Sequence, residues 1–517
     1  MKSKRIQQMF RKTGFFSVGL IAGIPFQVQA QSAPMNVIFI LADDLGWSDV
    51  TLYGTTALYE TPNIERLAAR GMTFTRAYSA SPLSSPTRAS ILTGQTPARN
   101  GITAPNCHLP QARMHPTVLS RAPSSDKAIG CESATRLDTN LPTLGKIMKG
   151  SGYATAHFGK WHLGPEPYSA ADHGFETDIP HWPGPGPAGS YVAPWKYPDF
   201  APKEPQEHIE DRMAREALEW LRNRPSDRPF YMNYWQFSVH APFNAKKELV
   251  EKYRNKIDTT NVQRSSTYAA MVESMDDAVG KLLDEVDRQG IADNTVIVFI
   301  SDNGGNCYST LQETLPDGTD YIAVPTSNAP LRGGKATMFE GGIRVPCIIV
   351  WPGVTRPGSR CDEIVQTTDF YPTFLEMLDL TPQQGHVIDG RSLLPSLRGE
   401  KRGRRPVFTY FPHNPPVPEW MPPSVSVHYG DWKLIRQFYQ GEHGEHGYLL
   451  YNLKHDVGER LNLASKHKGL VRKMDAMIER HLSDAATVIP QPNPRFDPKQ
   501  YRPENIGVSK PRKPIIP

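Results

Sequence analysis

Almost continuous hydrophobic runs alternate along the chain with stretches in which apolar residues recur at helical spacing. The runs NVIFILA (36–42) and TVIVFIS (295–301) are typical of strands that are covered on both faces of a sheet. After the first run, TPNIERLAARG has the spacing of an amphipathic helix and ends at Gly71. This alternation predicts strands and helices in turn within one large domain.

The same alternation continues further along the chain. We expect helices near 142–150, at 209–223 and at about 265–289, and strands at YATAHFG and PFYMNYWQFSV. This order indicates an α/β fold, in which helices cover both faces of a large mixed, mostly parallel sheet.

The pattern changes after about residue 400. VSVHYGDWKLIRQF, a turn near 441–447 and YLLYNL predict a small antiparallel sheet, followed by a helix near 467–482. We therefore expect a catalytic domain over 31–400, a smaller C-terminal subdomain over 401–485, and a tail over 486–517. The tail is rich in proline and basic residues, which is typical of a segment that wraps over the surface or is disordered.

The N-terminus is typical of a secretory signal peptide. Basic residues precede an apolar stretch over 15–26, and small residues stand at Val28 and Ala30, where a signal peptidase would cleave. We expect a signal peptide over 1–30, cleavage after about Ala30, and export of the mature protein to the periplasm, the cell surface or the medium. The apolar stretch is too short to span a bilayer and no later stretch is long enough, so no membrane span is expected.

Charge and cysteine content narrow the picture only slightly. The net charge of +5 on 517 residues argues neither for nor against an anionic partner, and we expect no nucleic-acid partner. The basic run KRGRR (401–405) is interpreted as a solvated loop, with contact to a polyanion as the alternative. Five cysteines form an odd set without metal-ligand spacing; one or two disulfides could form, with Cys107–Cys131 as the suggested pair.

Oxygen-bearing side chains follow two of the predicted strands directly. Asp43 and Asp44 come after NVIFILA, and Asp302 and Asn303 come after TVIVFIS. Because ligands bind at the carboxyl ends of strands in open α/β sheets, these four side chains could meet in one crevice. Carboxylates and an amide without imidazole or thiolate favour Ca²⁺ or Mg²⁺ over zinc. The alternative is that each pair only forms a turn or a cap at a strand end.

The stretch SPLSSPTRASILTG (81–94) contains a predicted helix start. Pro86 suits the first helical position and Ser85 a cap, which places Ser84 one step outside a helix N-terminus that favours an anion. Arg88 would lie one turn into the helix. No G-x-S-x-G elbow surrounds these serines, so an ordinary serine hydrolase is not indicated. The alternative is a serine that only caps the helix.

Ser84-Ser85-Pro86-Thr87-Arg88, followed by ILTG, resembles the (Cys/Ser)-x-Pro-x-Arg signature of the formylglycine-dependent sulfatases, in the alkaline phosphatase superfamily. Five further stretches resemble motifs of that family in the same order, so that six motifs span about 310 residues. They are NVIFILADDLGWSDV, GKWHLG (159–164), HAPF (240–243), SDNGG (301–305) and RGGKATMFEGGIRVP (332–346).

The resemblance implies an alkaline phosphatase-like fold and a modified serine. Ser84 would be oxidised to Cα-formylglycine and act as nucleophile and metal ligand. The serine type implies a bacterial protein matured by an anaerobic radical-SAM maturase. The implied ligands of Ca²⁺, with Mg²⁺ as the alternative, are Asp43, Asp44, Ser84, Asp302 and Asn303.

The resemblance also assigns roles to the remaining motif residues. Arg88 would hold the ionised nucleophile, while Lys160 and Lys335 would bind sulfate oxygens. His240 would bind substrate and protonate the leaving alcohol. His162, two residues beyond Lys160 and therefore on the same face of an extended segment, would be the base that expels sulfate. Taken singly, each could instead be an ordinary surface or loop residue.

The expected function is a carbohydrate O-sulfatase that releases sulfate from glycosaminoglycans, mucin glycans or algal polysaccharides near a chain end. The segments 104–135, 178–205, 306–330 and 410–425 would set its specificity. Alternatives are a broad arylsulfatase, a phosphonate or phosphate monoester hydrolase, and, if Ser84 is never oxidised, a glycan-binding pseudosulfatase. Further candidate substrate contacts are His173 and His181. Four aromatic residues could stack on sugar rings, with local packing as the alternative: Trp182, Tyr191, Trp195 and Trp420.

Overall fold

The computed structural model describes residues 34–509 and 512–517. The expected signal peptide over 1–30 lies outside the described residues and stays a prediction. Within the described part, no helix has both the length and the apolar character needed to cross a membrane.

A large mixed sheet lies at the centre of the fold. β1 (Asn36–Ala42) pairs in parallel with β8 (Phe230–Trp235) on one side and with β9 (Thr295–Ser301) on the other. The parallel part continues from β8 through β6 (Ala154–Gly159) to β7 (Thr177–Ile179). Beyond β9, the order is β12 (Arg344–Val350), which is antiparallel to both neighbours, β2 (Met72–Tyr78), and the short edge strands β13 (Ser359–Cys361) and β14 (Val365–Gln366). The predicted mixed, mostly parallel sheet is confirmed.

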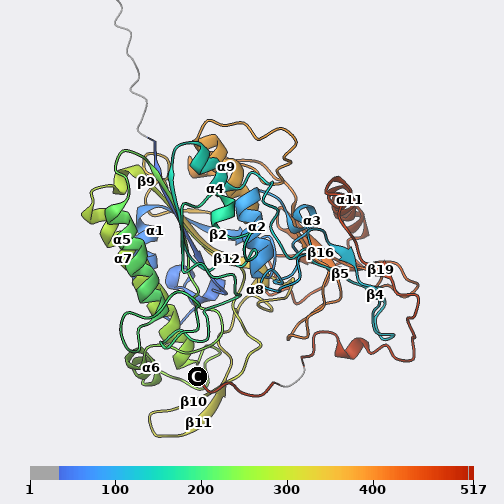
Figure 1. Ribbon diagram of the computed structural model, residues 1–517. Helices are drawn as coiled ribbons and strands as arrows, with labels where there is room; N and C mark the ends of the chain where they lie inside the picture. The colour runs from blue at the N-terminus through green and yellow to red at the C-terminus, as the bar shows by residue number, and fades with distance from the viewer. Residues whose placement is uncertain (1–33, 510–511) are drawn as a thin grey trace, which may run out of the picture. The chain divides into compact units, whose positions relative to one another are not determined.

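Helices cover both faces of this sheet (Figure 1). Alternate β1 side chains point to opposite faces, so Ile38 and Ile40 belong to one hydrophobic core and Val37 and Phe39 to the other. The first core is closed by α1 (Pro62–Arg70), α5 (Ile209–Asn223), α6 (Lys247–Arg254) and α7 (Ser266–Arg288). The second is closed by α2 (Ser84–Thr93), α4 (Leu144–Gly150) and α9 (Phe370–Met377).

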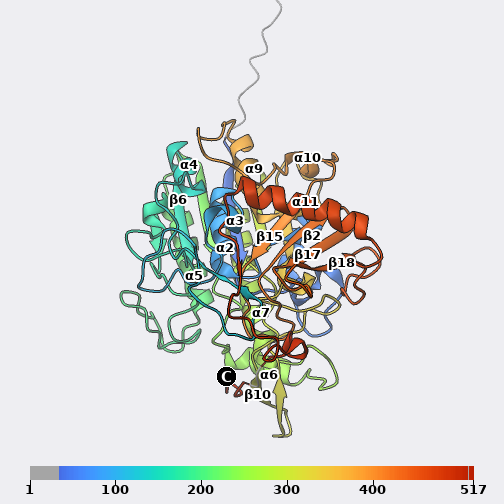
Figure 2. The same ribbon diagram turned by 90° about the vertical axis from the view of Figure 1, so that its right-hand side faces the viewer.

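The C-terminal part forms a separate antiparallel sheet, as predicted. Its strands are, in order, β15 (Val407–Phe411), β16 (Ser424–Tyr429), β17 (Trp432–Gln437) and β18 (Gly447–Asn452). α11 (Lys468–Asp484) lies across this sheet (Figure 2). Val425 and Leu434 of the sheet and Met474 of the helix share one small core.

Buried charges hold the C-terminal sheet to the catalytic part. Glu340, in the short helix α8 (Glu340–Ile343), accepts hydrogen bonds from Tyr78 and from Lys433, at 2.8 and 3.2 Å. His428 Nε2 lies 2.8 Å from the same carboxylate, and Lys433 also pairs with Glu459 at 2.7 Å. All five side chains are buried, so this network fixes the segment just after Lys335 against β16 and β17.

The tail after residue 485 lies along the surface of the catalytic part. β19 (Gln491–Pro492) pairs with β4 (Ala128–Ile129), and the Asp497 amide donates to the Ser124 carbonyl at 2.8 Å. Near the C-terminus the Ile515 amide donates to the Thr310 carbonyl at 2.7 Å. The remaining short α-helices and strands of the described residues are α3 (Pro97–Asn100), α10 (Leu394–Leu397), β3 (Thr117–Val118), β5 (Cys131–Glu132), β10 (Leu311–Thr314) and β11 (Asp320–Ala323).

The suggested Cys107–Cys131 disulfide is wrong, because all five cysteines are free thiols. Cys107 is buried in the second core, whereas the Cys131 thiol lies 3.8 Å from the Tyr410 hydroxyl and 3.5 Å from the Val488 carbonyl. The two thiols therefore lie in different surroundings.

Candidate active site

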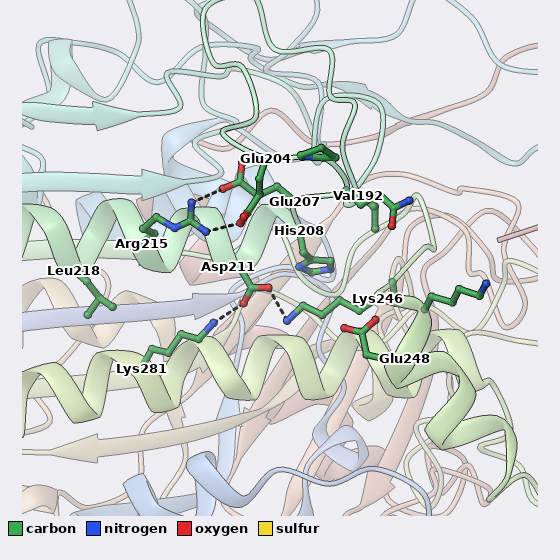
Figure 3. Close-up of a pocket in the computed structure, with 14 residues that line it drawn as sticks. Val192, Glu204, Glu207, His208, Asp211, Arg215, Leu218, Lys246, Glu248 and Lys281 are labelled. Carbon is green, nitrogen blue, oxygen red and sulfur yellow. Dashed lines mark hydrogen bonds and ion pairs between the residues drawn. The ribbon is translucent and has the colours of Figure 1, made fainter.

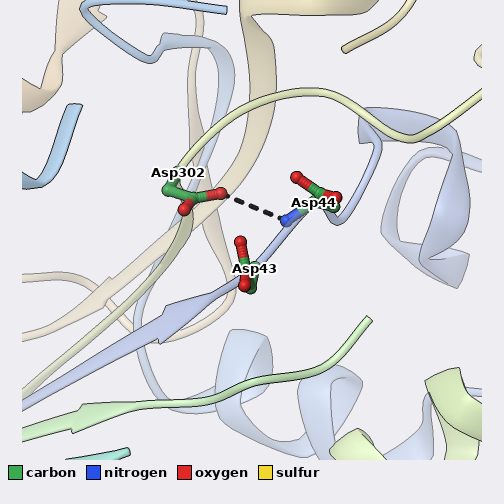
Figure 4. A group of neighbouring side chains, drawn as sticks. All are labelled: Asp43, Asp44 and Asp302. Carbon is green, nitrogen blue, oxygen red and sulfur yellow. Dashed lines mark hydrogen bonds between the residues drawn. The ribbon is translucent and has the colours of Figure 1, made fainter. Parts of the chain in front are cut away.

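Three aspartates meet at the carboxyl ends of β1 and β9. The parallel register pairs Ala42 with Ser301, so the residues that follow each strand emerge side by side. Asp43, Asp44 and Asp302 are fully buried, and one carboxylate oxygen from each lies within 4.8 Å of the others (Figure 4). The Asp44 amide also donates to Asp302 Oδ1 at 3.1 Å, which links the two strand ends directly.

Asn303 and Ser84 complete this oxygen-rich cluster. Asn303 Nδ2 donates to Asp44 Oδ1 at 2.8 Å, while its Oδ1 lies 3.4 Å from Ser84 Oγ. Ser84 Oγ is also 3.2 Å from Asp43 Oδ1. The structure thus brings together all five residues that the resemblance implies as metal ligands.

Three buried cations surround the carboxylates. Lys160 Nζ lies 2.7 and 2.9 Å from the two Asp43 oxygens and 3.1 Å from Ser84 Oγ. Lys335 Nζ donates to Asp44 Oδ2 at 2.6 Å. Arg88 donates to Asp302 Oδ2 from Nη2 at 2.8 Å and from Nε at 3.1 Å, and its Nη1 donates to the Lys160 carbonyl at 2.9 Å. The guanidinium is therefore fixed in position beside Asp302 and Asp43, with Nη2 3.6 Å from Asp43 Oδ1.

The start of α2 differs from the prediction. The helix begins at Ser84, with Leu83 as its extended cap residue, because the Thr87 amide bonds to the Leu83 carbonyl. Ser85 is therefore inside the first turn and does not cap it; its hydroxyl donates to the His162 carbonyl at 2.7 Å. Ser84 is thus itself part of the helix N-terminus, where the backbone N–H groups and the helix dipole favour an anion.

His240 faces the cluster from the segment after β8. Its Nε2 lies 3.8 Å from Asp44 Oδ2, and its Nδ1 lies 2.6 Å from the Ala241 carbonyl, which fixes the proton on Nδ1. Burial and the nearby charge of Lys335 lower the pKa of His240 to about 3. Nε2 is therefore unprotonated in this arrangement.

The His162 side chain contacts a second imidazole, that of His108, and does not lie on the same face of an extended segment as Lys160. Its backbone is left-handed, with φ of 57°, so the alternation expected of an extended segment is wrong here. Nε2 lies 3.1 Å from His108 Nδ1 and 3.1 Å from the Pro105 carbonyl, while Nδ1 is buried without a partner. Burial and the charge of Lys160 lower the pKa of His162 well below its usual range, so the ring is a neutral base.

Comparison with known families agrees with this geometry. The family model for sulfatases matches residues 35–380, which is most of the chain. The chain belongs to the sulfatase family. The model for the C-terminal region of N-sulphoglucosamine sulphohydrolase matches residues 334–486. The protein is accordingly a sulfuric ester hydrolase.

Individual relatives of this sulfatase cover most of its length. It is 31% identical to human N-acetylgalactosamine-6-sulfatase over 398 residues, covering 73% of this chain and 68% of that one. It is 30% identical to a sulfatase of Formosa agariphila, with 87% of each chain covered. It also resembles the crystal structure of Ps i-CgsB in complex with k-i-k-neocarrahexaose, with a TM-score of 0.69, 26% identity, and coverage of 88% and 94% of the two chains.

The aspartate cluster of this sulfatase fits a hard divalent cation. The donors are carboxylate, amide and hydroxyl oxygens, the ligands that Ca²⁺ and Mg²⁺ prefer. Burial raises the pKa of Asp43 in spite of the opposing charge of Lys160, and the nearby Asp302 and Asp44 carboxylates raise it further. Additional positive charge at this point would allow the three carboxylates to be ionised together.

Two of the other candidate substrate contacts are buried in the sulfatase core. His173 is fully buried against Trp161. Tyr191 is fully buried and donates to the carbonyls of Phe237 and His240, so the expectation that its ring stacks on a sugar is wrong.

His181 lies on the surface of the sulfatase. Its Nδ1 is 2.8 Å from Asp178, and its Nε2 is 3.4 Å from Glu166. These contacts are to neither the carboxylates nor the cations of the active site. Trp182, Trp195 and Trp420 are partly exposed.

Two residues that support the site could not be identified from the sequence pattern. His108 stands 54 positions from His162 in an irregular loop, so no local spacing connects them. Glu210 lies in the first turn of α5, yet its side chain is fully buried and accepts from the amides of Phe237 and Ser238 at 2.9 and 2.8 Å. Its position holds the segment that leads to His240.

A separate cavity of about 660 Å³ lies between α5, α6 and α7. Six of its charged side chains are paired with one another: Asp211 lies between Lys246 and Lys281, and Arg215 lies between Glu204 and Glu207 (Figure 3). None of the residues of the aspartate cluster or its cations lines this cavity, so it is separate from the candidate active site.

Proposed function

We propose that this sulfatase hydrolyses O-sulfate esters of carbohydrates, such as sulfated glycosaminoglycans, mucin glycans or algal polysaccharides, and releases inorganic sulfate. The observation that carries the proposal is the position of the Ser84 hydroxyl, between Asp43, Asn303 and Lys160 at the start of α2. The carbohydrate class is supported by two of the similar proteins: one is an N-acetylgalactosamine-6-sulfatase, and the other was crystallised with k-i-k-neocarrahexaose.

Ser84 is proposed to be oxidised to Cα-formylglycine by an anaerobic radical-SAM maturase. When present, the hydrated aldehyde supplies one hydroxyl as nucleophile and a second that allows sulfate to leave. An unmodified serine lacks that second hydroxyl, so its sulfate ester would have no comparable route to release. This is the chemical reason for a modified residue at position 84.

Charge neutralisation of the sulfate falls to the buried cations. Lys160 and Lys335 present ammonium groups toward the centre occupied by Ser84 and the aspartates, and both can donate to sulfate oxygens. Arg88 is held by Asp302 and by the Lys160 carbonyl, so its charge needs no rearrangement when substrate binds. Fixed charges of this kind stabilise the negative charge that develops during transfer.

Proton transfer is assigned to the two histidines. A sulfate ester beside His240 brings negative charge that opposes the effect of Lys335 and raises the pKa of Nε2, so that Nε2 can carry the proton for the leaving alcohol. His162 has a buried, unpartnered Nδ1 that can accept a proton during sulfate release, and its lowered pKa keeps the ring neutral before that step.

The proposed metal is Ca²⁺, with Mg²⁺ as the alternative. Asp43, Asp44, Asp302 and Asn303 would hold it together with the group derived from Ser84. A bound cation would polarise a sulfate oxygen and acidify the nucleophile. We also propose export to the periplasm, the cell surface or the medium, which N-terminal sequencing of protein from the native host would test.

The test combines mass spectrometry with a substrate screen. Protein is produced with and without a maturase, and the peptide carrying residue 84 is weighed; oxidation of serine to formylglycine removes two hydrogen atoms. Matured protein should desulfate defined sulfated saccharides faster than aryl sulfates or phosphate monoesters. Faster turnover of aryl sulfates would indicate an arylsulfatase, and faster turnover of phosphate esters a phosphatase or phosphonatase. Either result would refute the carbohydrate assignment.

A further inference from the structure

The basic run at 401–405 lines a cavity of about 260 Å³ that is distinct from the active site. The wall also includes residues from β2, from the segment before β14 and from the turn between β16 and β17. Six of the lining side chains are basic and three are acidic. The cavity thus carries an excess of positive charge.

Half of the basic side chains are neutralised by carboxylates. Arg76 pairs with Asp431 at 3.2 Å, Arg402 pairs with Glu363 at 3.3 Å, and Arg405 pairs with Asp369. These pairs hold Arg402 and Arg405, which are partly buried, whereas Lys401 and Arg404 are exposed, as expected of a solvated loop. Arg405 Nε is buried without a hydrogen-bond partner.

The other half have no acidic partner among the described residues. The Arg391 side chain donates only to the Arg402 carbonyl, while its backbone amide donates to Asp369 Oδ1 at 2.9 Å. Among the described residues, the side chains of Lys401 and Arg404 make no hydrogen bond or ion pair. Burial and the charges of Arg402 and Arg405 lower the pKa of Arg391, which is the effect of cations crowded together without sufficient compensation. In the cavity of Figure 3, by comparison, Arg215, Lys246 and Lys281 are each paired, and only Lys247 of its described lysine and arginine side chains lacks an acidic partner.

The place of the cavity in the sheet separates it from the catalytic centre. The aspartates follow β1 and β9, whereas the cavity lies beside β2 and β14 at the sheet edge. Two to four strand spacings of about 4.8 Å separate β9 and β1 from β2 and β14, which gives a lateral distance of about 10 to 19 Å. A single sulfated sugar in the active site would not reach so far, whereas a polymer would.

We propose that this cavity, formed around Arg391, Lys401 and Arg404, is a second anion site that binds a sulfate group further along a polymeric substrate. The inference rests on the proposed function, because it assumes a sulfated chain as substrate. Arginine suits this role, since its planar guanidinium presents several donors to an oxyanion. Inorganic sulfate and phosphate share this chemistry, so the test must separate them from a sulfated polymer.

The test compares two double variants that lose the same charge. Lys401→Gln/Arg404→Gln removes two unpaired cations from the cavity, and Lys466→Gln/Lys468→Gln removes two exposed lysines from the chain near the start of α11. Both are made in a Ser84→Ala background, in which substrate is not turned over. Binding of dextran sulfate is measured by calorimetry, with unmodified dextran, inorganic sulfate and phosphate as separate arms.

The cavity variant should bind dextran sulfate about fivefold more weakly than its parent, because two ion pairs between the cavity and sulfate groups of the polymer are lost. The control variant should bind within about twofold of the parent. Adding Arg391→Gln to the cavity variant should weaken binding further. Equal losses in both double variants would mean general attraction and overturn the proposal. Binding of inorganic sulfate or phosphate at the cavity without binding of dextran sulfate would overturn it as well.

Kinetics with the active, matured enzyme separate this inference from the proposed function. The cavity variant should raise KM for a sulfated polysaccharide about fivefold and leave kcat unchanged, with no change for an aryl sulfate. An unchanged KM for the polysaccharide would overturn the inference alone. If no sulfated carbohydrate is hydrolysed by the parent, the proposed function fails, while the dextran sulfate measurement still decides whether the cavity binds a polyanion.

Discussion

The surroundings of Glu210 predict how strongly this residue makes the free energy of unfolding depend on pH. The carboxyl is fully buried; Oε1 accepts from the amides of Phe237 and Ser238, and Oε2 has no hydrogen-bond partner. Burial raises the pKa of Glu210 from 4.5 to about 7, although the backbone hydrogen bonds oppose the rise. The folded protein therefore binds one more proton than the unfolded chain between these two values.

This extra proton determines the direction in which the free energy of unfolding changes with pH. Stability from the neutral carboxyl is fully present below pH 4.5 and is lost as the pH rises through about 7. A shift of two to three pKa units corresponds to about 3 kcal/mol at about 1.4 kcal/mol per unit. Glu210→Gln keeps an acceptor for the two amides but cannot ionise, so its free energy of unfolding should lack this loss.

The assay is urea unfolding, followed by tryptophan fluorescence at pH 5 and pH 8. Between these values the parent should lose about 2 to 3 kcal/mol more stability than Glu210→Gln. Glu219→Gln, on the exposed face of the same helix, is the matched control and should behave like the parent. Equal pH dependence in the parent and Glu210→Gln would refute the account of a protonated, buried carboxyl beneath the His240 segment.

Three further predictions concern the active site. Lys335→Met should lower kcat/KM for a sulfated saccharide about 100-fold, as loss of one oxyanion donor does in other enzymes. The reason is that Asp44 and a sulfate oxygen both lose the ammonium group that binds them. Steady-state kinetics test this prediction. His108→Ala should lower kcat about fivefold with KM unchanged, since His162 loses one hydrogen bond, whereas an unchanged kcat would show that the contact is incidental. Removal of the bound metal with a chelator should abolish turnover and lower the Tm, and added Ca²⁺ should restore both. Elemental analysis verifies that the metal has been removed. Full activity and an unchanged Tm in metal-free protein would exclude a metal at the aspartates.

The meeting of the two metal-ligand pairs could be predicted because residues that follow neighbouring parallel strands become spatial neighbours, whereas the other catalytic residues were identified only through the family resemblance. The two buried runs before Asp43 and before Asp302 have the composition of central parallel strands, and such strands end at the same edge of a sheet. The distance between the two pairs along the chain is then irrelevant. The same reasoning correctly gave the α/β order and the C-terminal antiparallel sheet.

Other features depend on tertiary contacts that leave no local pattern. Glu210 has the sequence context of an exposed residue in the first turn of a helix, and only the packing of α5 against the segment after β8 buries it. The contact between His108 and His162 arises where an irregular loop crosses the active site. Serine is a common helix-cap residue, but Ser85 lies inside the helix because the hydrogen bond from the Thr87 amide to the Leu83 carbonyl makes Ser84 the first helical residue.

The most direct test of the central claim measures residue 84 and sulfate release in the same samples. Protein batches with different degrees of maturation are analysed by peptide mass spectrometry for the fraction of residue 84 that has lost two hydrogen atoms. Each batch is then assayed for inorganic sulfate released from a sulfated saccharide. The account predicts turnover proportional to the modified fraction and none from protein that retains Ser84. Sustained turnover by protein in which residue 84 is entirely serine would contradict it.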